Sequence, residues 1–316
     1  MSRGLALLLA ATIVTAACGS DGDADGGPRP SGRLDVFPAS FDLAVGQPSR
    51  FLVGVSTRGN LFVSGGTVEL RFSFLGQGGP GGGEPAGGAT ASFLPIPGEE
   101  DEPVPDVPTA APGEAARGVY VVDEIGFDRP GFYEVEVTAD LGGDVSAGNG
   151  AFEVLPEPLV PVPGQRAPRT ENHVLGEPGV ADEAIDSRAA TGGIPDPELH
   201  EATIAGAIRA GRPALAVFAT PVYCVSRFCG PVTDMVAELG GEYGDRAEFI
   251  HVEIWANFQD GAVNRAAADW LLREGNLQEP WVFLIGADGR IAARWDNVAT
   301  RQEIEPLLRD LPPMGG

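Results

Sequence analysis

Two cysteines five positions apart carry the most reactive side chains in this 316-residue sequence. Cys224 and Cys229 form the pair, and Cys18 is the third cysteine. A thiolate attacks a disulfide sulfur, and a second thiol nearby resolves the mixed disulfide that forms. In an oxidising compartment such a pair is either a structural disulfide or a working dithiol. The pair is therefore the first place to look for chemistry, and that chemistry would be thiol–disulfide exchange.

The spacing limits where the two cysteines can lie. If both were helical, they would be about 7.5 Å apart along the axis and about 140° apart around it. A disulfide needs Cα atoms roughly 4.4–6.8 Å apart. The pair can close only if Cys224 lies in a loop and a helix begins around Ser226–Phe228. A helix N-terminus favours a thiolate; this arrangement favours Cys224 as the more exposed, attacking sulfur and Cys229 as the resolving one, and the reverse assignment is the alternative.

The first residues indicate export. Arg3 and the apolar run that follows predict a signal peptide over residues 1–17, because the run is too short to span a membrane. Thr15-Ala16-Ala17-Cys18 resembles the lipobox of bacterial lipoproteins, although Leu is usual where Thr15 stands. The resemblance implies a lipid anchor on Cys18, a flexible tether over 18–33 and a position on the extracytoplasmic side of the cell membrane. The alternative is an ordinary secretory signal with an incidental cysteine.

Residues 34–155 follow a period of two. Apolar side chains alternate without error through Thr67–Phe74, and similar short runs are separated by turn residues. Asp128–Tyr133 resembles the Asp-x-Gly-x-Tyr corner of immunoglobulin-like domains, with one residue inserted. The pattern predicts an antiparallel, Ig-like β-sandwich.

The C-terminal part has a different pattern. A Pro-rich stretch predicts a linker over 156–195. From residue 196 onward helix and strand alternate: a buried strand is predicted at 214–219, a helix through Val232–Leu239 and a hairpin from 281 to 295. This alternation predicts a separate α/β domain over 196–316.

Local residues in this domain resemble the thioredoxin family. Cys229-Gly230-Pro231 is similar to the start of the family's Cys-Gly-Pro-Cys box, and Glu279-Pro280-Trp281 to its cis-proline segment. The resemblance implies an α/β thioredoxin-like domain behind the sandwich. It also implies that Pro280 shapes a substrate groove beside the dithiol, bordered by Glu279 and Trp281.

The sequence departs from that family in two ways. The spacing is Cys-x4-Cys, so Cys224 and Cys229 compete for the place of the nucleophile. Glu279 stands where the family usually has an uncharged residue; a carboxylate there would raise the thiol pKa, unless it points to solvent. The spacing is also similar to one peroxiredoxin subgroup, but Thr220 is four residues before Cys224, not three, and the long N-terminal part of that fold is missing.

Metal binding is the other chemistry open to the pair. Two thiolates and a distant histidine hold copper in some thioredoxin-fold copper proteins. Here His173 lies in the predicted linker, His200 is expected at a helix surface and His251 is expected as a packed strand residue. The sequence therefore predicts no metal site and no cofactor.

Composition narrows the function. The net charge is −24, with 45 acidic and 21 basic residues, and such a surface repels nucleic acid. We expect a membrane-anchored thiol–disulfide oxidoreductase that acts on exported thiol or disulfide proteins, or with a membrane redox partner, through Cys224 and Cys229. The alternatives are a binding module whose disulfide is structural, and a copper-delivery protein.

Overall fold

The computed structural model describes residues 32–314 apart from 80, 100–102, 113–117 and 225. The predicted signal peptide over 1–17, Cys18 and nearly all of the predicted tether lie outside the described residues. Among the helices that are described, none is long and apolar enough to cross a membrane.

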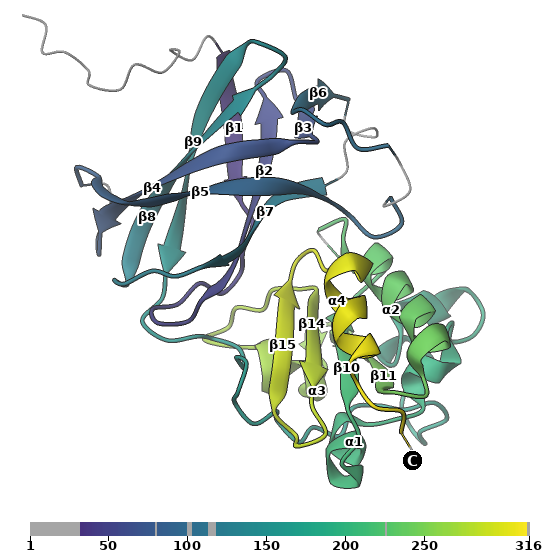
Figure 1. Ribbon diagram of the computed structural model, residues 1–316. Helices are drawn as coiled ribbons and strands as arrows, with labels where there is room; N and C mark the ends of the chain where they lie inside the picture. Colours follow the sequence, from purple (N-terminus) through teal and green to yellow (C-terminus); the bar gives the residue numbers. More distant parts are fainter. Residues whose placement is uncertain (1–31, 80, 100–102, 113–117, 225, 315–316) are drawn as a thin grey trace, which may run out of the picture.

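The strands between Gly32 and Val154 form one β-sheet that closes on itself (Figure 1). Seven strands follow one another around it in the order β1, β9, β8, β4, β5, β7, β2, and β2 pairs again with β1. Two three-residue strands, β3 and β6, extend the sheet beyond β2. The strands are β1 (Gly32–Pro38), β2 (Ser49–Thr57), β3 (Phe62–Ser64), β4 (Thr67–Gly76), β5 (Glu84–Pro95), β6 (Thr109–Ala111), β7 (Gly118–Ile125), β8 (Gly131–Asp140) and β9 (Val145–Val154).

The closure depends on β1. This strand runs antiparallel to β2, with Val36 opposite Val55, and parallel to β9, with Arg33 opposite Ala147. Two glycines of β9 allow the approach, because a Cβ on Gly148 would overlap the carbonyl oxygen of Leu34, and a Cβ on Gly150 would overlap the Pro38 ring. The first and last strands of this part can therefore meet.

The interior of the barrel confirms the alternation read from the sequence. Val68, Leu70 and Phe72 of β4 are buried, and the residues between them are exposed. Phe72 packs edge-to-face against Phe51, with ring centroids 5.1 Å apart. Apolar side chains from the other strands complete one core.

The C-terminal part is built on a four-stranded sheet in the order β11, β10, β14, β15. The first two strands are parallel and the other pairings are antiparallel. Helices α1 and α3 pack on one face and α2 and α4 on the other. The elements are α1 (Ile204–Ala210), β10 (Ala214–Ala219), α2 (Cys229–Tyr243), β11 (Glu248–Glu253), β12 (Trp255–Asn257), β13 (Ala262–Val263), α3 (Arg265–Leu271), β14 (Trp281–Ile285), β15 (Ile291–Asp296) and α4 (Arg301–Arg309).

The fold-class prediction is wrong and is corrected on both counts. Instead of an Ig-like sandwich, the N-terminal strands form a closed seven-stranded barrel. Instead of a sandwich followed by an α/β thioredoxin-like domain, the described chain is mostly β with four short α-helices. Alternation shows only which face of a strand is buried, and sandwich and barrel share that pattern. His200, expected at a helix surface, ends a 3-10 turn at Pro197–His200, and a seven-residue α1 follows because Thr203 caps a new helix.

Residues 156–195, read as a linker, pack against the C-terminal sheet. Val160 and Val162 are buried, and Gly164 donates a backbone hydrogen bond to Ile291 on β15 at 2.8 Å. Two further 3-10 turns, Asp182–Ala184 and Ser187–Thr191, lie in this segment. The segment gains its order from contacts distant in sequence, which local composition does not reveal.

Charged side chains join the barrel to the C-terminal part. Arg50 of β2 contacts Glu303 of α4 at 3.0 Å and Asp296 of β15 at 3.8 Å. Asp42 accepts from Arg294 of β15 at 2.6 Å. These five carboxylate and guanidinium groups are at most 19% exposed, so the two parts meet through a largely desolvated ion-pair network.

Candidate functional site

Cys224 and Cys229 form a disulfide at the start of α2, with Cα atoms 6.2 Å apart. Cys229 is the first residue of the helix, and Cys224 lies in the loop that follows β10. The helix begins one residue after the predicted range Ser226–Phe228. The loop position of Cys224 is what the disulfide distance requires, because two helical residues at this spacing lie too far apart.

The two sulfurs have different surroundings. Cys229 is fully buried among apolar side chains of α2 and the sheet, whereas Cys224 is partly exposed. Phe228, the N-cap of α2, provides no side-chain cap, and the first turn of this helix has no acidic residue. No carboxylate of the helix's own first turn therefore competes for its N-terminal N–H groups, and the helix dipole favours a thiolate there.

Glu279 lies beside the disulfide. One carboxylate oxygen of Glu279 and the Sγ atoms of Cys224 and Cys229 all lie within 4.8 Å of one another. Burial, and then the charge of Glu253, raise the pKa of the Glu279 carboxyl above its ordinary value. Glu279 therefore points toward the two sulfurs and not to solvent. At this distance its carboxyl can exchange a proton with a thiol of the pair.

The other two predicted groove residues lie differently. The Glu279–Pro280 peptide bond is cis and Pro280 is buried. Trp281 is 3% exposed and stacks on Phe283 with ring centroids 5.5 Å apart. It lines a cavity of about 290 Å³ with residues of the barrel–sheet junction, including Arg50. Trp281 therefore belongs to the core and that junction.

An aromatic surface that the sequence did not reveal borders the cysteine loop. Tyr223, next to Cys224 in the chain, stacks on Phe258 with ring centroids 4.0 Å apart and planes inclined by 2°. Trp255 meets the same Phe258 ring at 5.4 Å. These three rings line a cavity of about 250 Å³, and Phe258 is 40% exposed. Trp255 is half-exposed.

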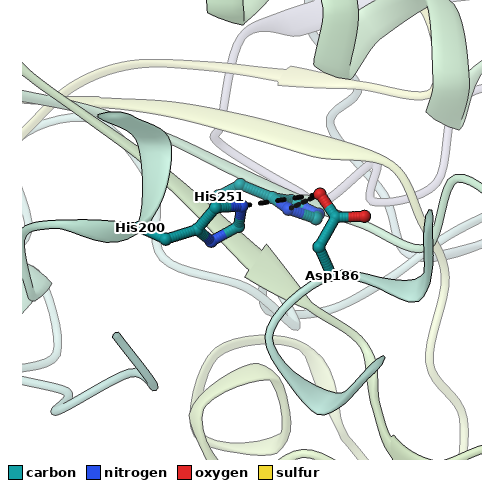
Figure 2. Close-up of side chains that lie close together, drawn as sticks. All are labelled: Asp186, His200 and His251. Atoms are coloured by element: carbon teal, nitrogen blue, oxygen red, sulfur yellow. Dashed lines mark ion pairs between the residues drawn. The ribbon is translucent and has the colours of Figure 1, made fainter. Parts of the chain in front are cut away.

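A second group of side chains comes together behind the cysteine loop (Figure 2). Asp186, His200 and His251 each offer a ligand atom, and these three atoms lie within 4.8 Å of one another. All three residues are buried. His200 was expected at a helix surface, and Asp186 lies in the segment read as a linker, so only His251 has the environment that the sequence suggested. His173 is half-exposed and pairs with Glu177 at 2.9 Å.

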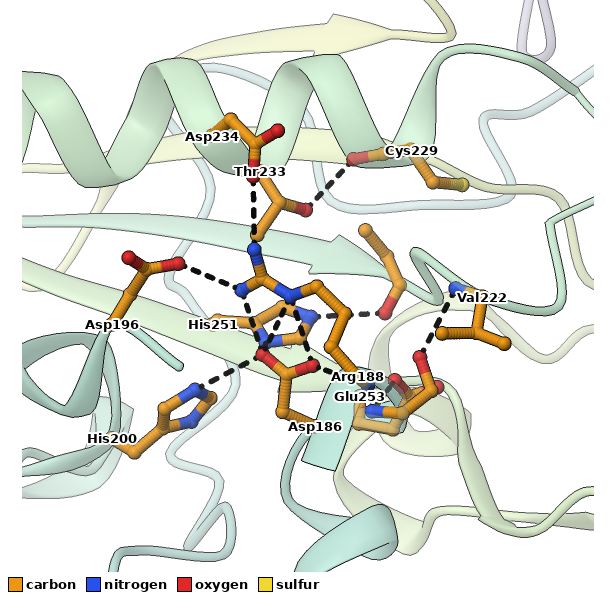
Figure 3. Close-up of polar contacts among 12 residues, drawn as sticks. Asp186, Arg188, Asp196, His200, Val222, Cys229, Thr233, Asp234, His251 and Glu253 are labelled. Atoms are coloured by element: carbon orange, nitrogen blue, oxygen red, sulfur yellow. Dashed lines mark hydrogen bonds and ion pairs between the residues drawn. The ribbon is translucent and has the colours of Figure 1, made fainter. Parts of the chain in front are cut away.

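Hydrogen bonds link this group to the cysteine loop and to α2 (Figure 3). The Ser187 hydroxyl accepts from the backbone N–H of Val222, two residues before Cys224, at 3.3 Å. Arg188 contacts Asp186 at 2.8 Å and Asp234 of α2 at 2.9 Å. The segment around 186–188 therefore supports both the loop and the helix that carry the disulfide.

Comparison of the sequence with protein-family models finds no match. A search of curated proteins also finds no match. The geometry of the site is accordingly the basis for assigning a function.

Proposed function

We propose that this protein is a membrane-anchored, extracytoplasmic thiol–disulfide oxidoreductase that acts on exported proteins through Cys224 and Cys229. One observation carries the proposal: the partly exposed Cys224 is bonded to the fully buried Cys229, the first residue of a 15-residue helix. An exchange catalyst needs one accessible sulfur and one resolving sulfur that is protected from competing thiols. The apolar leader and the Cys18 sequence support the location.

The exchange begins at the accessible sulfur. A substrate thiolate attacks Cys224 Sγ, a substrate–Cys224 disulfide forms and Cys229 leaves as a thiolate at the helix N-terminus. A second substrate thiolate then attacks the substrate sulfur and releases Cys224. The substrate dithiol is oxidised to a disulfide and the Cys224–Cys229 disulfide is reduced to two thiols; the reverse sequence reduces a substrate disulfide.

Glu279 supplies the proton that this sequence needs. The Cys229 thiolate is formed where water does not reach it, because Cys229 is fully buried. Glu279 has a carboxylate oxygen within 4.8 Å of both sulfurs and a raised pKa. A protonated carboxyl gives its proton to the leaving thiolate, and the carboxylate takes it back when Cys229 attacks in the reverse direction.

The aromatic surface provides a place for an unfolded substrate. Tyr223 and Phe258 expose a stacked pair next to Cys224, and Val222 is 53% exposed. Unfolded chains present apolar side chains near their cysteines, and aromatic rings bind such side chains without demanding one sequence. This surface favours protein substrates over small thiols.

Mixed-disulfide trapping tests the proposal. In the full-length chain carrying Cys18→Ser, Cys229→Ser should form a stable adduct between Cys224 and a disulfide-containing peptide, since no resolving thiol remains. The matched variant Cys224→Ser should form little adduct, because Cys229 is buried. Absence of an adduct in Cys229→Ser would contradict the proposal.

The second candidate is a binding module in which the disulfide is structural. The burial of Cys229 in the apolar cluster between α2 and the sheet favours this reading. A disulfide closing so short a loop stabilises a fold by at most a few kcal/mol. A structural disulfide would have a reduction potential below about −300 mV, whereas an exchange catalyst would have one between about −120 and −270 mV, so the potential of the Cys224–Cys229 pair separates the two functions.

A further inference from the structure

The buried group of Asp186, His200 and His251 presents its ligand atoms to one point (Figure 2). His200 Nε2 lies 3.4 Å from Asp186 Oδ2, and His251 Nδ1 lies 3.3 Å from the same oxygen. The side chains of all three residues are 0% exposed. The three come from distant parts of the chain: Asp186 precedes the second 3-10 turn, His200 ends the third and His251 is on β11.

The hydrogen-bond pattern places two acceptors, His251 Nδ1 and Asp186 Oδ2, face to face. His251 Nε2 lies 3.1 Å from the carbonyl oxygen of Ala219, and a carbonyl only accepts, so Nε2 carries the hydrogen. In a neutral imidazole the lone pair is then on Nδ1, 3.3 Å from a carboxylate oxygen that also carries lone pairs. Two acceptors at this distance repel each other unless a positive charge lies between them.

His200 adds a second unsatisfied group. Neither of its ring nitrogens has a hydrogen bond of acceptable geometry among the described residues, although Nε2 is within ion-pair distance of Asp186. A buried polar atom without a partner costs about 1–3 kcal/mol. His200 Nε2 is buried, lacks a hydrogen-bond partner of acceptable geometry among the described residues and faces the same oxygen as His251 Nδ1. Such a nitrogen is well placed to coordinate a metal ion.

The distances match a metal centre. Zinc binds imidazole nitrogen and carboxylate oxygen at about 2.0–2.2 Å in tetrahedral geometry, which places neighbouring ligand atoms about 3.3–3.6 Å apart. The two separations from Asp186 Oδ2 are 3.4 and 3.3 Å. Imidazole with carboxylate is a ligand set suited to first-row transition ions.

The surroundings also suit a cation. Arg188 donates to Asp186 Oδ2, the oxygen that both imidazoles face, at 2.8 Å, and the Arg188 charge is matched by Asp196 and Asp234, each at 2.9 Å. These four groups carry a net negative charge. Metal-ligating histidines usually donate their other ring N–H to a carbonyl or carboxylate, and the carbonyl of Ala219 accepts from His251 in this way.

We propose that Asp186 Oδ2, His200 Nε2 and His251 Nδ1 form a structural binding site for a divalent first-row transition ion such as Zn²⁺. The ion would fasten the segment around residues 182–200 to β11, behind the loop that carries Cys224. The three protein ligands leave one tetrahedral position for a small ligand such as water. This site is independent of the redox function, because neither cysteine is among its ligands.

Zn²⁺ binding by the full-length protein tests the site. The protein carries Cys18→Ser and an intact Cys224–Cys229 disulfide, so no free thiol can bind metal. It is freed of metal with a chelator and refolded with or without Zn²⁺, because a fully buried site opens slowly in the folded state. We expect one equivalent of bound Zn²⁺ and a higher Tm with the metal than without it.

Matched variants locate the ligands. Asp186→Asn and His200→Gln should bind Zn²⁺ more than about tenfold more weakly than the parent. His173→Gln, which removes the half-exposed histidine that pairs with Glu177, should bind like the parent. Equal binding by all variants would overturn the site.

A spectroscopic readout covers the case in which the ligand variants do not fold. With ¹⁵N-labelled histidine, Zn²⁺ should shift the ring signals of two histidines and leave the third, assigned with His173→Gln, in place. Absence of stoichiometric Zn²⁺ or Co²⁺ binding by the refolded parent protein would overturn the proposal and identify the group as a buried imidazolium–carboxylate pair.

Discussion

Cys224 and Cys229 share one disulfide but differ in exposure: the Cys224 residue is partly exposed and the Cys229 residue is 0% exposed. The difference follows from their positions, because Cys224 is in a loop and Cys229 begins α2 with its side chain in the apolar layer beneath the helix. Under the proposed function, this difference makes Cys224 the attacking sulfur and Cys229 the resolving one.

Reduced protein should therefore react unequally with an alkylating reagent. We expect iodoacetamide to modify Cys224 at least tenfold faster than Cys229, because a thiol must be accessible and ionised to react. Peptide mass spectrometry of briefly treated Cys18→Ser protein measures the ratio. Equal modification of the two thiols would contradict the assigned roles.

Replacing Glu279 should change the reactivity of Cys224. Its carboxylate lies within 4.8 Å of the sulfur, and a nearby negative charge raises a thiol pKa. Glu279→Gln should lower the pKa of the Cys224 thiol and speed its alkylation near neutral pH. The pH dependence of the alkylation rate gives this pKa, and Glu157→Gln, at an exposed position, should leave it unchanged.

The same substitution should affect stability in a pH-dependent way. Burial, with a contribution from Glu253, raises the pKa of Glu279 in the folded protein. The folded state therefore disfavours the ionised form of Glu279. As pH rises from the pKa of Glu279 in the unfolded chain through its pKa in the folded protein, this carboxyl makes the protein progressively less stable. Glu279→Gln should stabilise the oxidised protein at pH 7, and this gain should vanish below the ordinary pKa of 4.5. Denaturant unfolding of both proteins at several pH values measures this gain. A gain in the free energy of unfolding that does not change with pH would show that the raised pKa of Glu279 is not its cause.

The sequence predicted local structure better than it predicted long-range contacts. The alternation in Thr67–Phe74 and the apolar run at 214–219 predicted β4 and β10, and both strands are present. Closure of the barrel depends on the pairing of Arg33 with Ala147, and no local pattern encodes a contact across more than a hundred residues. Alternation could therefore not separate a barrel from a sandwich.

The candidate sites show the same limit. The sequence predicted that Cys224 lies in a loop, because two helical residues at this spacing are too far apart to form a disulfide. The approach of Glu279 to the sulfurs depends on how β14 packs beside β10, and Asp186 lies in a stretch without apolar periodicity. The signal that was available for the buried group was the presence of two histidines, His200 and His251, near apolar residues.

The aromatic surface should matter for protein substrates only. Tyr223→Ala and Phe258→Ala each remove one ring of a stacked pair, and such pairs contribute about 0.5–1.5 kcal/mol. We expect kcat/KM for an unfolded protein substrate to fall roughly 2- to 10-fold, while the rate with a small disulfide stays unchanged. Phe37→Ala, which removes a 53%-exposed ring from β1, is the control; an equal loss there would contradict a specific surface.

The junction between barrel and sheet should depend on Arg50. Removing it leaves Glu303 and Asp296 largely buried without their cation, and breaking such a pair costs about 3–5 kcal/mol. Arg50→Ala should lower the free energy of unfolding by that amount. Arg209→Ala, whose partner Glu171 is as exposed as itself at 59%, should cost under about 1 kcal/mol. Similar losses in both variants would show that the junction is not held in this way.

The most direct test of the central claim is the reduction potential of the Cys224–Cys229 pair. The full-length Cys18→Ser protein is equilibrated across a series of thiol redox buffers, its free thiols are alkylated and the modified chains are counted by mass spectrometry. An exchange catalyst should have a potential between about −120 and −270 mV. A value below about −300 mV would identify a structural disulfide and contradict the oxidoreductase function.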